Sequence, residues 1–146
     1  MSKSNACENG LLLLLFNNTD FANIGDAGGL QNSAAAGSLY FSLHTSDPGE
    51  AGSQTTNEIS YTGYARVAVA RSGAGFTVTA NSVSPAADVT FGAMTAGAGG
   101  TVTHFGLGTA SSGAGTLLYS GTVTPNIVVS NGVTPILTTA TAITED

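Results

Sequence analysis

The chain of 146 residues carries three basic residues against nine carboxylates, which gives a formal net charge of −6. Direct binding to nucleic acid needs clustered Lys or Arg, so this balance excludes it. Charged residues make up only 8% of the chain, far below the roughly 25% of ordinary soluble domains. Such a surface favours association, and we expect the protein to work inside an assembly.

The cysteine content and a leucine-rich run add two further exclusions. Cys7 is alone, so neither an intrachain disulfide nor a thiolate metal site can form. The run LLLLLF at residues 11–16 is shorter than the ~7–15 residues of a signal-peptide core and the ~20 residues of a membrane span. We therefore expect a protein without an export signal and without a membrane contact.

Residues 4–16 (SNACENGLLLLLF) predict a short helix. Asn5 is placed to cap this helix, with Glu8 three residues later at the spacing of a capping box. After Gly10 the helix is apolar on all sides, so it must be buried under a sheet or against another molecule. We interpret residues 1–38 as a helix and linker arm that docks onto a partner. The expected partner-contacting residues are Leu11, Leu12, Leu15 and Phe16.

Alternating strand patterns begin after this arm. LYFSLH at residues 39–44 alternates apolar and polar side chains, with His44 on the polar face, and YARVAVA at residues 64–70 repeats the alternation. Between them, DPG at residues 47–49 predicts a turn, because proline presets φ and glycine accepts a positive φ. The two patterns therefore predict two strands joined by a long polar loop.

The rest of the chain is almost purely β in pattern. Further strands are expected at residues 76–80, 88–94, 101–109, 117–121, 127–129, 133–137 and 141–144. Asn131-Gly132 is the strongest hairpin signal in the sequence. Short strands separated by Gly, Ser and Asn turns predict an all-β fold, a compact antiparallel β-sandwich or partly closed barrel of eight or nine strands over residues 39–146.

The remaining polar residues match no enzymatic, metal or cofactor motif. His44 precedes Asp47 by three residues, and His104 lies in TVTHFG, but no nucleophile elbow G-x-S-x-G accompanies either histidine. The loop carboxylates Asp47, Glu50 and Glu58 fit no calcium-binding pattern, so we expect a solvated acidic loop. We expect no catalytic residue, no metal and no cofactor, and we treat both histidines as strand residues with backbone or water partners.

Four longer segments carry a resemblance. They are ENGLLLLLFN at residues 8–17, HTSDPGEAGSQTTNEISYTGYARVAVAR at 44–71, THFGLGTASSGAGTLLYSGTV at 103–123 and NGVTPILTTATAITED at 131–146. The sequence is similar to a family of small all-β phage virion proteins, some labelled tail-fibre-like and some assigned as head decoration (cement) proteins. The resemblance covers nearly the whole chain, although the LLLLL run makes this helix more apolar than we expect for the family. It implies a structural role in the virion and brings no catalytic residues.

The absence of fibrous repeats decides between these two expected roles. Fibres usually carry a shaft built from repeats or heptads, and this sequence has neither. We therefore expect a capsid decoration protein on the outer surface of an icosahedral phage head. In this interpretation the protein is made in the host cytoplasm and forms a homotrimer. It stabilises contacts between major capsid protein subunits through many small contacts.

Two other functions stay open. A tail or fibre component that binds host-surface glycan would present its tyrosines together on one exposed face, because sugar rings stack on aromatic platforms. The candidate platform residues are Tyr40, Tyr61, Tyr64 and Tyr119. A hydrolase of cell-wall polymer would instead need His44 or His104 in a cleft beside a carboxylate.

Overall fold

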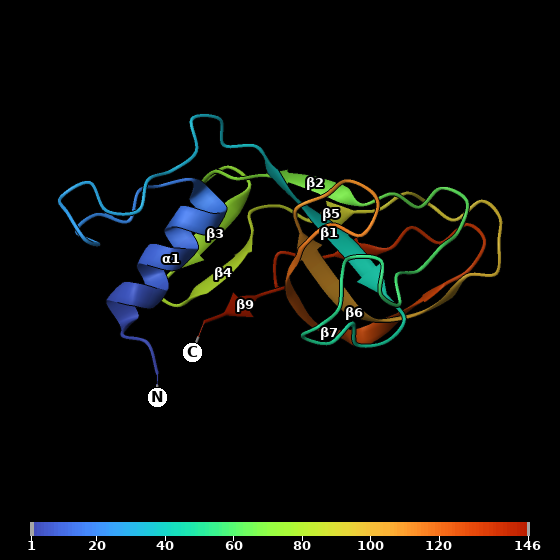
Figure 1. Ribbon diagram of the computed structural model, residues 1–146. Helices are drawn as coiled ribbons and strands as arrows, with labels where there is room; N and C mark the ends of the chain where they lie inside the picture. Colours follow the sequence, from blue (N-terminus) through green and yellow to red (C-terminus); the bar gives the residue numbers. More distant parts are fainter. Residues whose placement is uncertain (1, 146) are drawn as a thin grey trace. The chain divides into compact units, whose positions relative to one another are not determined.

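The computed structural model describes residues 2–145, which form nine strands and one N-terminal helix (Figure 1). In chain order the elements are α1 (Asn5–Asn17), β1 (Ser38–His44), β2 (Val67–Ala70), β3 (Phe76–Thr79), β4 (Ser82–Pro85), β5 (Val89–Thr90), β6 (Gly100–Gly108), β7 (Leu117–Val129), β8 (Ile136–Leu137) and β9 (Ile143–Thr144). The strands pair in antiparallel fashion in open sheets rather than in a closed barrel. The predicted all-β antiparallel fold is confirmed.

The described chain divides into two compact units. Unit 1 comprises the residues up to Ser38, Val69–Ala87 and the residues from Thr138 onward, and unit 2 comprises Leu39–Ala68 and Asp88–Leu137. This grouping differs from the expected division into residues 1–38 and 39–146. The difference arises because β3, β4 and β9 cluster with the N-terminal helix rather than with the other strands.

Unit 1 is a three-stranded sheet in the order β3-β4-β9 with α1 packed against β3 and β4 (Figure 1). Its core holds Leu12, Phe16, Phe76 and Val83, all at most 1% exposed. The rings of Phe16 and Phe76 meet edge to face with centroids 5.0 Å apart, a favoured aromatic geometry. Strand β4 was not expected, because its sequence SVSP has only one strong β-former.

The N-cap of the helix lies one residue earlier than predicted. Ser4, not Asn5, is the N-cap: its backbone is extended and its hydroxyl accepts the N–H of Cys7 at 3.3 Å. The helix ends at Asn17, and the C-cap Asn18 has a left-handed φ of 53°. Gly10 inside the helix has a local reason, since a Cβ there would lie 2.6 Å from the ring of Phe21.

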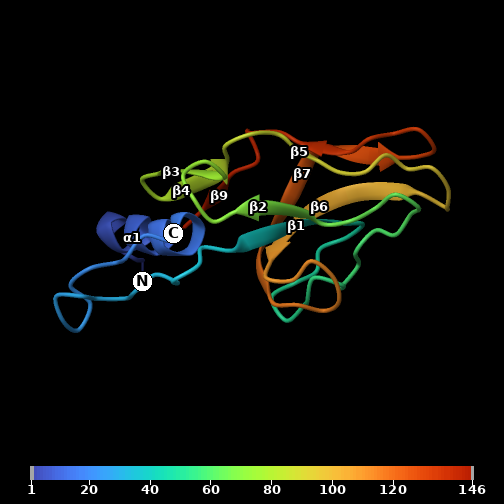
Figure 2. The same ribbon diagram turned by 90° about the horizontal axis from the view of Figure 1, so that it is seen from above.

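Unit 2 holds most of a four-stranded sheet in the order β2-β1-β6-β7 and a two-stranded ribbon of β5 and β8. Figure 2 shows β2, β1 and β6 as neighbours in this sheet. In the register between β1 and β6, Phe41 faces Leu107 and Leu43 faces Phe105. These four apolar side chains are at most 3% exposed and form the centre of the core of unit 2.

Two sequence predictions about the later strands are wrong in detail. The expected strands 117–121 and 127–129 form the single strand β7, in which residues 123–126 bulge out between the partners of Val102 and His104. Gly132 does turn the chain with φ at 86°, but no hairpin joins β7 to β8. Instead β8 pairs with β5, and the N–H of Gly132 donates to the carbonyl of Met94.

Candidate functional site

The four leucine-helix residues predicted to contact a partner fall into two classes. Leu12 and Phe16 are fully buried in the core of unit 1, against β3 and β4. Leu11 and Leu15 are half-buried. The first pair therefore has an intramolecular role, and a partner contact through it would need the helix to leave its own sheet. Contact with another molecule through Leu11 and Leu15 needs no such rearrangement and stays a prediction.

Arg71 binds carbonyl groups at the C-terminal end of the helix. Its guanidinium donates to the carbonyls of Leu14 and Leu15 at 2.8 and 2.7 Å, and to the carbonyl of Ala36 at 3.0 Å. These helix carbonyls have no partner within the helix, and a cation at this end also complements the helix dipole. Arg71 therefore fixes α1 within unit 1, which sequence reasoning did not anticipate.

A loop after the helix presents apolar side chains. Phe21 and Leu30 pair through two backbone hydrogen bonds, of 3.0 and 2.9 Å, and close the loop between them. Asp26 stabilises its tip by accepting the N–H groups of Gly28 and Gly29. Ile24 is 45% exposed and Leu30 41%. Unit 1 thus carries ordered, exposed apolar residues in addition to its half-buried leucines.

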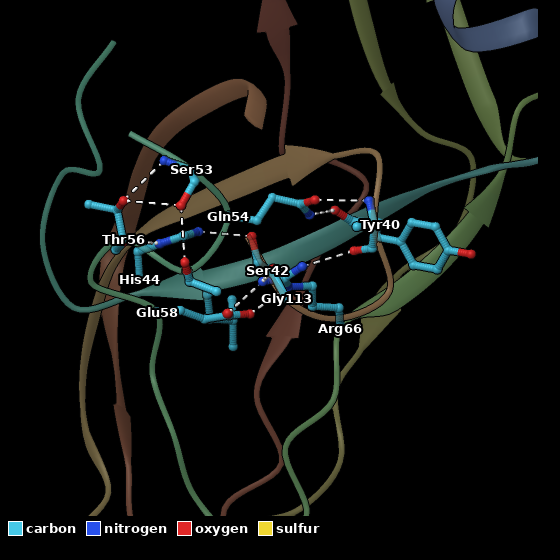
Figure 3. Close-up of polar contacts among 12 residues, drawn as sticks. Tyr40, Ser42, His44, Ser53, Gln54, Thr56, Glu58, Arg66 and Gly113 are labelled. Carbon is cyan, nitrogen blue, oxygen red and sulfur yellow. Dashed lines mark hydrogen bonds and ion pairs between the residues drawn. The ribbon is translucent and has the colours of Figure 1, made fainter. Parts of the chain in front are cut away.

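Unit 2 contains a buried serine and histidine pair (Figure 3). Ser42 and His44 are both 0% exposed, and Ser42 Oγ lies 2.8 Å from His44 Nε2. His44 Nδ1 lies 2.8 Å from the carbonyl of Thr56, so this nitrogen donates and Nε2 accepts the serine hydroxyl. Burial lowers the pKa of His44. The pair has the atoms of a nucleophile and a base, but its burial leaves no access for a substrate. Its contact with Thr56 instead connects β1 to the long polar loop.

The placement of His44 corrects one expectation and confirms another. The predicted polar face at the end of β1 is not exposed, because the loop at residues 45–66 folds back over it. The predicted backbone partner is present as the Thr56 carbonyl. Room for the pair comes from Gly106, opposite Ser42 in the register: a Cβ there would lie 2.5 Å from His44 Nε2.

An ion pair joins the middle of the same loop to its C-terminal end. Arg66 donates from Nε and Nη2 to the two carboxylate oxygens of Glu58, both at 2.7 Å, and also to the carbonyls of Ala110 and Gly113 (Figure 3). The side chain of Arg66 is 3% exposed. The hydrogen bond to Glu58 raises the pKa of Arg66. Glu58 is therefore not part of a solvated acidic loop, as was expected, but half of a part-buried bidentate pair.

Gln54 completes the attachment of the loop. This fully buried amide accepts the N–H of Ala110 at 2.9 Å and donates to the carbonyl of Tyr40 at 3.4 Å. The backbone N–H of Gln54 donates to the carbonyl of Ala114 at 2.8 Å. Loop 45–66 and loop 109–116 are therefore tied to each other and to the sheet by directional hydrogen bonds.

Sequence reasoning missed these polar residues, although one signal was present. Arg66 and Glu58 are charged residues in a chain that has few charges, and two of its three basic residues lie close together in residues 66–71. Rare charges in such a chain have a structural reason more often than charges on an ordinary surface. No comparable signal marks Gln54.

The four tyrosines do not form one exposed platform. Tyr61 is 8% exposed and its hydroxyl donates to the carbonyl of Gly92. Tyr64 stacks on Phe91, donates to Glu58 and accepts the N–H of Leu43, and burial raises its pKa. Tyr40 and Tyr119 are half-buried. Two of the expected platform residues therefore belong to the core of unit 2.

Tyr119 borders a hollow on the surface of unit 2. The hollow has a volume of about 290 Å³ and is open to solvent. Its lining residues are Asp47, Gly49, Glu50, Leu117, Leu118, Tyr119 and Ser120. The predicted turn is confirmed: Gly49 has a φ of 70°, and its N–H donates to Asp47 Oδ1 at 2.9 Å. The hollow thus combines two carboxylates, an aromatic ring and a hydroxyl.

Two classes of site are not seen in residues 2–145. Among these residues no group of three His, Cys, Asp or Glu side chains lies together in a way that could hold a metal ion. His104 is instead near its neighbour, with Nδ1 2.9 Å from Thr103 Oγ1. Within the same part of the chain, no helix has the length and apolar character needed to cross a membrane.

Comparison with known proteins identifies the family. The chain finds no match among curated proteins. A family model described as podophage GP4 fiber I protein gp80 matches residues 2–144, which include both units and the hollow. The chain therefore belongs to the family of the podophage GP4 fiber I protein gp80, and it is a structural protein of a phage virion.

Proposed function

We propose that the protein is a subunit of a phage tail fibre that contributes to binding of host-surface glycan. The observation that carries this proposal is the match of a fibre protein family over residues 2–144. The lack of a shaft repeat, which favoured head decoration from the sequence, is compatible with this role, since a compact subunit can attach to a shaft made by other chains. The surface hollow beside Tyr119 supports the glycan contact.

Within this proposal the two units have different tasks. Unit 1 contacts neighbouring subunits of the fibre, copies of this chain included, through Leu11, Leu15 and the exposed residues Ile24 and Leu30. A protein contact there would remove these apolar side chains from water, which favours association. Unit 2 presents a surface whose loops are held rigid by buried polar contacts, which lowers the entropy lost on binding a ligand. Self-assembly into a trimer is the expected state of the attached protein.

The location of the protein on the virion tests the proposal. Immunogold electron microscopy of intact virions, with an antibody against this chain, should place gold on the tail. Gold spread over the whole head would contradict the fibre function and favour the decoration of major capsid protein subunits. A virion preparation without the protein is the control for antibody specificity.

The state of assembly has its own test. Sedimentation of the purified protein should show three copies, and Leu15→Asp should shift the population toward the monomer because it places a charge in an apolar contact. Thr19→Asp, an exposed position beyond the end of the helix, is the matched control and should leave the mass unchanged. A variant that stays trimeric with Leu15→Asp would exclude Leu15 from the contact between copies.

A further inference from the structure

The hollow in unit 2 approaches the size of a small ligand site. Its volume of about 290 Å³ is close to the lower end of the ~300–1,000 Å³ found for small-molecule sites. Loop 47–50 forms one side and the start of β7 forms the other. The space is open to solvent, so a terminal or side-chain sugar of a longer polymer can enter it without a rearrangement.

The loop side of the hollow is preformed. Asp47 Oδ1 accepts the N–H of Gly49, and the Asp47 carbonyl accepts the side-chain amide of Asn57 at 3.0 Å. Gly52 donates its N–H to the carbonyl of Gly49 at 3.0 Å. These bonds hold the Asp47 carboxylate and the backbone of residues 47–52 in place before a ligand arrives. A preformed site loses less conformational entropy on binding.

The charges around the hollow determine which sign of charge a ligand can carry. Asp47 and Glu50 line the hollow. The basic residues of the chain are engaged elsewhere: Arg66 pairs with Glu58, Lys3 pairs with Glu145, and Arg71 binds helix carbonyls. Carboxylates accept hydrogen bonds from hydroxyl and ammonium groups and repel sugar carboxylates and phosphates.

We propose that this hollow binds a sugar unit without negative charge and binds amino sugars most tightly. The inference rests on the proposed glycan-binding function and adds the class of sugar. The ring of Tyr119 and the side chains of Leu117 and Leu118 contact the apolar face of the sugar. The carboxylates of Asp47 and Glu50 accept hydrogen bonds from its amino and hydroxyl groups.

Three trisaccharides of different charge test the proposal. Trimers of glucosamine, of N-acetylglucosamine and of galacturonic acid are titrated into the whole protein at mildly acidic pH, where the free amine is protonated. The expected order of affinity is glucosamine, then N-acetylglucosamine, then galacturonic acid. Added salt should reduce the differences, because it screens exposed charges. Equal or tighter binding of the galacturonic acid trimer would overturn the proposal.

Isosteric variants locate the binding. Asp47→Asn with Glu50→Gln removes both charges, and the asparagine keeps the oxygen that holds Gly49. The double variant should bind the glucosamine trimer weaker by roughly two- to fivefold for each carboxylate. Asp20→Asn in unit 1 changes one charge, keeps its own backbone contact to Asn32, and should leave every affinity unchanged. Equal affinities in the double variant and this control would exclude the hollow.

Two variants of Tyr119 test the contact between its ring and the sugar. Tyr119→Phe keeps the ring and should retain binding of the N-acetylglucosamine trimer, whereas Tyr119→Ala should lose it. Retained binding in Tyr119→Ala would overturn the predicted ring contact. Amide signals of Asp47, Gly49, Glu50 and residues 117–120 should shift with added trimer in the NMR spectrum of the unmodified protein. Shifts confined to other residues would also count against the hollow.

The inference and the proposed function fail in different experiments. Gold on the phage head would contradict the fibre function, and the titrations would still decide whether the hollow binds sugar. If gold lies on the tail and none of the trimers distinguishes the Asp47→Asn, Glu50→Gln variant from the control, the fibre function stands and the sugar site is wrong.

Discussion

The two units bury polar side chains to different depths. Unit 1 has an apolar core of Leu12, Phe16, Phe76 and Val83, and its buried Glu8 retains 5% exposure. Unit 2 buries Ser42, His44 and Gln54 completely among its aromatic residues. Apolar packing tolerates small shifts, whereas hydrogen bonds require particular distances and angles. The buried hydrogen bonds of unit 2 therefore hold its loops in one arrangement. One of these loops forms one side of the hollow.

The largest expected effect concerns the ion pair of unit 2. Arg66→Ala leaves the part-buried Glu58 carboxylate without its charged partner and removes the donors to two loop carbonyls, so the free energy of unfolding should fall by about 3–5 kcal/mol. Urea unfolding followed by circular dichroism measures this loss. The double variant Glu58→Gln with Arg66→Met should lose less, because it leaves no uncompensated charge. A loss as large in the double variant would show that the carbonyl contacts, not the charges, dominate.

The next effect lies in the core of unit 1. Leu12→Ala removes a fully buried side chain and should lower the free energy of unfolding by about 2–5 kcal/mol. Leu15→Ala, on the half-buried side of the same helix, should cost less than about 1 kcal/mol. Hydrogen exchange of the amides in α1 distinguishes the two variants. Similar exchange in both would mean that the helix is held by Arg71 and its caps rather than by its apolar contacts.

A smaller effect is expected where the serine and histidine pair meets β6. Gly106→Ala places a methyl group 2.5 Å from His44 Nε2 and 2.7 Å from Ser42 Oγ. Neither side chain can move far within the core, so the free energy of unfolding should fall by about 1–3 kcal/mol. Gly73→Ala is the matched control: nothing lies within 4 Å, and it should change stability by less than about 0.5 kcal/mol. Thermal unfolding of the two variants gives the comparison.

The smallest effect is a dependence of stability on pH. Burial lowers the pKa of His44 below its ordinary value of 6.5, and the nearby Arg66 and His104 lower it further, while the Thr56 carbonyl and Glu58 act in the opposite direction. The unfolded chain therefore binds a proton that the folded chain does not. Stability is full above pH 6.5 and falls below it by about 1.4 kcal/mol per pH unit, until the lowered pKa of the folded state is reached.

The pH dependence can be assigned by substitution. His44→Gln keeps hydrogen-bonding atoms in the side chain but cannot titrate, so its stability should change less than that of the unmodified protein between neutral and mildly acidic pH. Denaturant unfolding at several pH values measures both slopes. An unchanged slope in His44→Gln would assign the dependence to the carboxylates instead.

Local patterns predicted much of the fold. The alternation in residues 39–44, the turn at Gly49 and the strand around Phe105 follow from the identities of neighbouring residues. Strand β4 was missed because its four residues include only one strong β-former, and the pairing of β8 with β5 was missed because hairpin signals describe only adjacent strands. Pairing between strands that are far apart in the chain has no signal in the local sequence.

The candidate site shows the same limit. The sequence marked Asp47, Glu50 and Tyr119 as separate polar or aromatic residues, and only the fold brings them around one hollow. It also placed His44 on a polar face, and the loop that covers this face is attached through residues 53–58 and 110–114.

The sequence by itself determined the fold class, the positions of the helix and most strands, and membership of a phage virion family, because these depend on local periodicity and on motifs contiguous in the chain. Only the tertiary structure decided that Leu12 and Phe16 belong to a core, that Glu58 and Arg66 form a part-buried pair, and that a hollow lies beside Tyr119. Burial and hydrogen bonding join residues far apart in the chain, and no local pattern records which of them will meet.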